Sequence, residues 1–99
     1  MYRGTTPTLD FTIPFDTELI SELYLTFSQK DRPLFEKQKS DCKCESNIIS
    51  VRLSQEETLK LDDAYSVEIQ MRVKTTEDEV LASEIIKVSV SQILKDGVI

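Results

Sequence analysis

Few side chains in this sequence have the chemistry that catalysis needs. There is no histidine, which removes the commonest general base, the common catalytic triads and most catalytic zinc sites. The 18 Asp and Glu residues leave catalysis by paired carboxylates formally open. However, many of them cluster in stretches of turn character, such as Glu56–Glu57, Asp62–Asp63 and Glu77–Glu79. Solvated surface is the usual place for such clusters, so we expect no enzymatic activity and no cofactor.

The two cysteines, Cys42 and Cys44 in the stretch DCKCE, are the other candidates for chemistry. A metal site built on two thiolates needs two further ligands, and only Asp41 and Glu45 adjoin the pair. A disulfide between residues this close would close a very small ring and tends to be strained. We therefore expect free thiols near a loop, and no metal site.

Length and charge limit the class of protein. Of the 99 residues, 39% are hydrophobic and 30% are charged, with a net charge of -6. This is enough for one hydrophobic core, so residues 1–99 are expected to form a single domain. The acidic balance argues against nucleic acid and anionic membrane as partners. We see neither a membrane-spanning apolar run nor a secretory leader, which predicts that the chain stays in the cytoplasm where it is made.

Alternation of apolar and polar residues is the strongest structural signal. Five runs show it: Leu9 to Ile13, Leu23 to Phe27, Ile49 to Leu53, Tyr65 to Val73, and Ile86 to Val90. A period of two predicts half-buried β-strands. Weaker candidates at residues 34–39 and 80–83 bring the expected total to about seven strands. Their short spacing predicts an all-β fold, an antiparallel immunoglobulin-like β-sandwich.

The segment VRLSQEETLKLDDAYSVEI, residues 51–69, interrupts this pattern with a helix-start signal. Ser54 followed by Glu57 forms a capping box, in which each side chain can satisfy a backbone donor of the other residue. We expect one short helical turn near residues 55–61. An immunoglobulin-like sandwich crosses between its sheets at such a place, and a tyrosine there commonly anchors the crossing through its hydroxyl. Ser54, Glu57 and Tyr65 are therefore predicted to form a structural corner.

The closing stretch SQILKDGVI is more apolar than a chain terminus usually is. Its apolar residues are Ile93, Leu94, Val98 and Ile99. Such a segment either packs against its own domain or contacts a neighbouring chain by pairing with a sheet edge, and both alternatives stay open. These four residues are our candidate subunit interface.

Three stretches of the chain resemble small phage and prophage proteins of Firmicutes: MYRGTTPTLDFTIPFD, VRLSQEETLKLDDAYSVEIQMRV and ILKDGVI. More distantly, the pattern is similar to the amino-terminal β-sandwich of phage baseplate and tail proteins, where an L-T/S-x-E-E-T turn precedes a strand carrying Y-x-V-x-I-Q-x-R-V. The resemblance brings no catalytic residues. It implies a structural protein of the tail or baseplate region that assembles with itself, as a homo-oligomer, or with another virion protein. Such a protein resides in the host cytoplasm during expression and then in the virion.

Two other function classes compete with this one. A phage-encoded interaction module could bind or inhibit a host protein, because an acidic surface can imitate nucleic acid or dock on a basic enzyme. An enzyme acting through carboxylates or Cys42 would need a deep pocket lined by a carboxylate pair or a reactive thiol.

Overall fold

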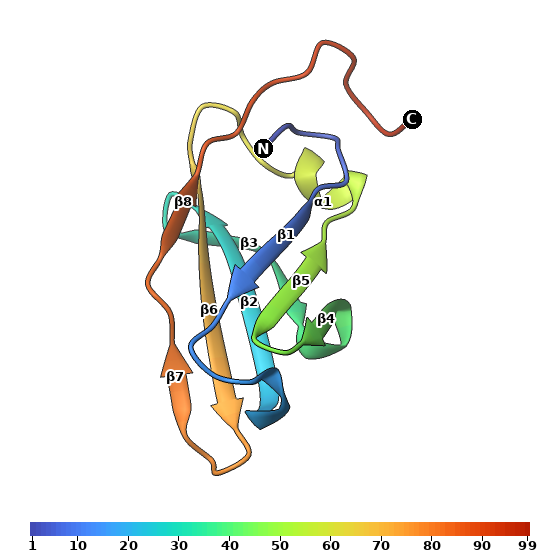
Figure 1. Cartoon of the computed structure of the whole chain (residues 1–99). Coiled ribbons are helices and arrows are strands. Elements are labelled where there is room, and N and C mark those ends of the chain that lie inside the picture. The colour runs from blue at the N-terminus through green and yellow to red at the C-terminus, as the bar shows by residue number, and fades with distance from the viewer.

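The computed structural model describes all residues, 1–99, as two antiparallel sheets packed face to face (Figure 1). The first sheet has three strands in the order β1 (Thr8–Thr12), β5 (Ile48–Arg52) and β4 (Cys42–Glu45). The second has five strands: β3 (Arg32–Gln38), β2 (Ile20–Gln29) and β6 (Val67–Thr75) lie side by side, and both β7 (Val80–Ala82) and β8 (Ile86–Val88) pair with β6. The predicted all-β antiparallel sandwich is therefore confirmed.

Helical structure is limited to three short segments. These are the 3-10 turns η1 (Thr17–Leu19) and η2 (Lys39–Asp41) and the α-helix α1 (Gln55–Leu59). The predicted helical turn near residues 55–61 corresponds to α1, which lies between β5 and β6. No helix of the structure is long and apolar enough to cross a membrane.

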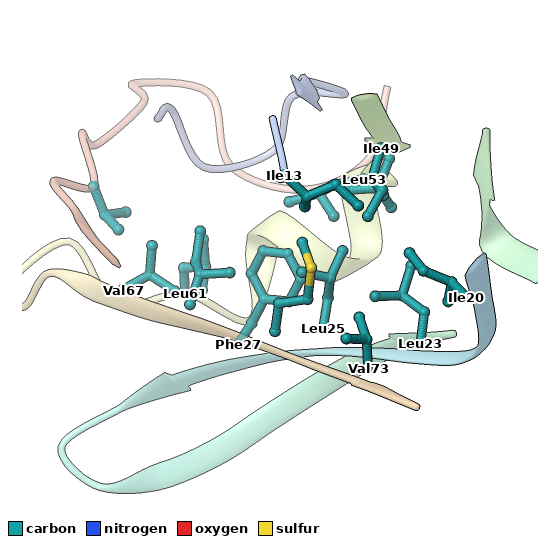
Figure 2. Packing of buried hydrophobic residues seen from close by; sticks show 14 residues of the cluster. Ile13, Ile20, Leu23, Leu25, Phe27, Ile49, Leu53, Leu61, Val67 and Val73 are labelled. Atoms are coloured by element: carbon teal, nitrogen blue, oxygen red, sulfur yellow. The ribbon is translucent and has the colours of Figure 1, made fainter. Parts of the chain in front are cut away.

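The hydrophobic core lies between the two sheets, as Figure 2 shows. The alternating residues of the central strands supply most of it, with Leu23, Leu25 and Phe27 from β2 and Val67, Ile69, Met71 and Val73 from β6. Ile49 and Val51 of β5 face them from the first sheet. The ring of Phe27 also stacks on Phe35 of β3, with centroids 4.6 Å apart. The period of two in the sequence therefore marks the inward-facing side chains of the central strands.

All five alternating runs contain a strand, and so do the weaker candidates at residues 34–39 and 80–83. The cysteine segment differs from the prediction, because residues 42–45 form β4 rather than a loop. This strand is short and has exposed Lys43 and Glu45, which hides its alternation in the sequence. It forms a short local hairpin with β5, in which Cys42 and Cys44 pair with Val51 and Ile49.

Ser83 divides the outer edge of the second sheet into β7 and β8. Its backbone N–H donates to the carbonyl of Met71 (2.8 Å), and its hydroxyl accepts from the Met71 N–H (3.0 Å) and donates to the carbonyl of Glu84 (2.9 Å). The side chain thus takes a hydrogen bond that the strand ladder would otherwise make. As a result, two three-residue strands stand where one continuous edge strand is possible.

Candidate interaction surfaces

The corner after β5 begins with the predicted capping box. The Glu57 N–H donates to the Ser54 hydroxyl (3.1 Å), and the Ser54 N–H donates to a Glu57 carboxylate oxygen (2.8 Å). One turn later, the hydroxyl of the fully buried Thr58 donates to the carbonyl of Thr5 (2.8 Å). The capping box fixes the start of α1, and Thr58 attaches the helix to the N-terminal segment.

Glu57 also forms a partly buried ion pair with Lys37 of β3. The Lys37 Nζ lies 2.8 Å from the Glu57 Oε1, and the two side chains are 14% and 19% exposed. Burial opposes the charge of Glu57, but the hydrogen bonds from Lys37 and Ser54 together outweigh it and lower the pKa of the carboxyl. The carboxylate therefore joins α1 to the edge of the second sheet, which is a structural role.

Gln29, at the end of β2, holds the other end of this corner. Its side-chain Nε2 donates to the carbonyls of Asp62 (2.8 Å) and Tyr65 (3.0 Å), and its Oε1 accepts from the Asp62 N–H (2.9 Å). Gln29 is only 6% exposed. The Tyr65 hydroxyl, expected to anchor the corner, makes no hydrogen bond in the structure, and Lys30 Nζ instead lies 4.1 Å from the centroid of the tyrosine ring. Gln29 continues the inward phase of Leu23, Leu25 and Phe27, and sequence reasoning missed it because its side chain is polar.

The cysteines are free and half-buried, on the inward side of β4. Burial, and then the neighbouring Cys44 and Asp41, raise the pKa of the Cys42 thiol to about 11. The Cys42 Sγ donates to the carbonyl of Gln38 (3.3 Å). Because the thiolate is the nucleophile, this thiol is poorly reactive near neutral pH. No three His, Cys, Asp or Glu side chains are grouped so that they could hold a metal ion.

The candidate interface residues at the C-terminus are brought onto the α1 end of the sandwich. The Gln55 side chain of α1 holds Ile99 at two points, since its Oε1 accepts from the Ile99 N–H (2.9 Å) and its Nε2 donates to the Ile99 carbonyl (3.3 Å). Leu94 is 100% exposed, Ile99 87% and Val98 55%. Ile93 alone is half-buried, packed so closely on Gly4 that a Cβ there would lie 2.8 Å from its Cδ1.

Arg3 fastens the N-terminal segment to the same end of the sandwich. Its guanidinium donates to the carbonyls of Leu61 (2.7 Å) and Leu59 (3.1 Å), just beyond and at the end of α1. Nearby, the backbone of Tyr2 bridges to Ser91 in parallel, so the two terminal segments lie side by side (Figure 1). The apolar tail therefore follows a segment, at Ser91, that is held against the N-terminal segment.

A second surface, which the sequence did not reveal, lies on the side of the sandwich where β7 meets the loop after β1. A hollow of about 320 Å³ is lined there by apolar side chains of Ile13, Pro14, Phe15, Met71, Val73, Leu81 and Ala82. A second hollow of about 270 Å³ adjoins it, sharing Phe15 and Leu81 and adding Leu19, Glu77 and Glu79. We call the two together the apolar groove.

The two chain segments beside the apolar groove are acidic, with Lys74 at their border, 3.9 Å from the Asp78 Oδ1. Residues 8–19 and 75–86, which include β1, η1 and β7, hold seven of the 18 acidic residues and none of the 12 basic ones. The rest of the chain carries 11 acidic and 12 basic residues, so the net charge of -6 comes from these two segments. We call them the acidic side. A charge count along the sequence could have found this imbalance, but not the groove that the two segments enclose.

Comparison of the chain with protein-family models, with curated proteins and with solved structures gave no match. The geometry of the tail, the groove and the acidic side therefore provides the structural basis for a functional proposal.

Proposed function

We propose that this chain is a non-enzymatic structural protein of a phage or prophage, from the tail or baseplate region, that acts by protein–protein assembly. The exposed apolar tail carries the proposal. Leu94 and Ile99 are almost wholly in water although each is a large aliphatic side chain. Burying such a side chain in a contact gains roughly 1.5–3 kcal/mol. The resemblance of three sequence stretches to phage proteins supports the setting.

The partner is another copy of the chain, giving a homo-oligomer, or another virion protein. The tail is suited to either, because Gln55 and the packing of Ile93 hold its ends while Leu94 and Val98 point away from the core. The protein would be present in the host cytoplasm during expression and in the virion after assembly.

We also infer that the sandwich is of the immunoglobulin-like type. In that fold one sheet contains strands B, E and D in this order, and the other contains G, F, C and, in the variable type, C′. The orders β1-β5-β4 and β7/β8-β6-β2-β3 support the same sequence of strands. The crossing at α1, between β5 and β6, then corresponds to the corner between strands E and F.

The test is the solution mass of the protein, measured by size-exclusion chromatography with light scattering. We expect a mass at least twice that of the 11.4 kDa chain, or co-elution with particles or with products of neighbouring genes. Leu94→Ser should abolish the association without unfolding the protein, since that side chain is fully exposed. Ile48→Ser, at an exposed apolar residue of β5, is the matched control. A monomer that also fails to co-elute with any of these would contradict the proposal.

The second candidate is a phage-encoded module that binds or inhibits a host protein. The acidic side favours it, because concentrated negative charge can compete for a basic surface. Recovery of one stoichiometric host protein in a pulldown, in place of virion proteins, would favour this candidate over the first.

A further inference from the structure

The inner face of β7 is not covered by the opposite sheet. Leu81 pairs with Val73 of β6, so both side chains lie on the inner face of the second sheet. Val73 is only 6% exposed, whereas Leu81 is 41% exposed. The first sheet has three strands and ends at β1, so it covers β6 but leaves the inner face of β7 in the apolar groove.

The backbone of β7 is open on the same side. In an antiparallel pair, residues alternate between those that hydrogen-bond to the partner strand and those that point away from it. Thr75 bonds to Glu79 and Met71 bonds to Ser83, which places the bonded positions of this edge at odd-numbered residues. Val80 and Ala82 therefore direct their N–H and C=O groups outward, and no other strand follows β7 in the sheet. An extended segment can pair there.

The charge of the acidic side decides what kind of segment fits. A symmetric contact between two copies through the apolar groove would place Glu77 and Glu79 of one copy against the same two carboxylates of the other. Like charges placed against each other oppose association by several kcal/mol. The remainder of the chain carries 11 acidic and 12 basic residues, so a second copy brings no large excess of positive charge. Complementarity therefore favours a different protein with a basic segment.

We propose that the apolar groove binds an extended, lysine- or arginine-rich segment of another protein. The segment adds as a strand to the open edge of β7, with every second side chain apolar and placed against Leu81, Phe15 and Leu19. Its basic side chains meet Glu77 and Glu79 at the rim. This inference rests on the proposed assembly function and specifies the chemistry of the partner.

The probe is a short fluorescent peptide of alternating lysine and valine, titrated with the full chain and followed by anisotropy. A peptide of alternating glutamate and valine has the same apolar positions and the opposite charge. We expect the lysine peptide to bind at least about tenfold more tightly than the glutamate peptide, and added salt to weaken it. Equal binding of the two peptides, or no binding of the lysine peptide, would overturn the proposal.

Two pairs of variants separate the apolar groove from general charge attraction. Leu81→Glu places a carboxylate in the groove, and Ile86→Glu places one on β8 at a side chain of similar exposure, 44% against 41%. An added carboxylate would strengthen purely electrostatic binding, so a loss of about tenfold with Leu81→Glu alone is diagnostic. Glu79→Lys should weaken binding similarly, whereas Glu36→Lys on β3, at the opposite edge of the sheet, should not.

Circular dichroism of each variant checks that the sandwich is intact. Equal affinities of the Leu81 and Ile86 variants would refute the groove as the binding site. If the peptide fails to bind while the Leu94→Ser variant still loses assembly, this inference is wrong and the proposed function stands. If assembly is absent while the peptide binds as expected, the proposed assembly function is wrong and the peptide-binding groove stands.

Discussion

Replacing Gln29 with methionine tests whether a single buried amide holds the crossing between the sheets. Methionine has nearly the same length and volume but makes none of the three hydrogen bonds to Asp62 and Tyr65. Each such bond contributes about 1 kcal/mol, and the abandoned backbone groups are partly buried, so Gln29→Met should cost about 3 kcal/mol of unfolding free energy. For a domain of this size the melting temperature should fall by roughly 12 to 24 °C.

The measurement is urea denaturation of the variant and the parent, with amide hydrogen exchange read at Asp62. The Asp62 N–H donates to the Gln29 Oε1, so its protection should fall more than that of the core strands. Gln70→Met is the matched control, because the Gln70 amide makes one exposed hydrogen bond, to Ser83, and should cost less than about 1 kcal/mol. A Gln29→Met cost no larger than that of the control, with Asp62 still protected, would refute the reasoning.

Two further predictions concern titratable groups. Because the pKa of Glu57 is lowered in the folded protein from its ordinary 4.5, its stabilising contribution is present above that value and is lost as pH falls through the folded pKa. Glu57→Gln should therefore reduce the free energy of unfolding at pH 7 and flatten its decline at acid pH. An unchanged pH profile, measured by urea denaturation, would contradict the role of the Lys37 ion pair. A Cys42 pKa of about 11, against an ordinary 9.0, should make alkylation by iodoacetamide about a hundredfold slower in the native protein than in urea, and equal rates by peptide mass mapping would contradict the burial of this thiol.

The central strands could be predicted from the sequence because their side chains alternate over long runs. Residues 67–73 and 23–27 bury every second side chain, so one face of each strand is marked by composition alone. Ser54 and Glu57 are also local, since a capping box needs only residues three apart. These features depend on neighbours in the chain.

The features that escaped prediction depend on residues far apart in the chain. The corner is closed by Gln29, whose partners begin at residue 62. The apolar groove arises because the first sheet has one strand position fewer than the second, which no local pattern encodes. The charge imbalance of the acidic side can be counted from the sequence, but the exposure of Leu81 beside it cannot be predicted from the sequence.

The strand pairing also determines how the chain must fold. β1 pairs with β5, joining Thr8 to Arg52, and β2 pairs with β6, joining Ile20 to Thr75. Long loops must close before these contacts stabilise anything, which places folding in the millisecond-to-second range of β-sandwiches. The local pairings are the hairpins β2–β3, β4–β5 and β6–β7. In the first of them, the turn residues Lys30 and Asp31 have positive φ values of 51° and 60°.

During synthesis this order has a direct consequence. β2 has no β6 beside it until residue 75 has been synthesised, when about three quarters of the chain has been made. Between the synthesis of residue 38, where β3 ends, and that of residue 75, the nascent chain therefore carries the β2–β3 hairpin without its central neighbour, and chaperones would find an apolar binding site on it at that stage.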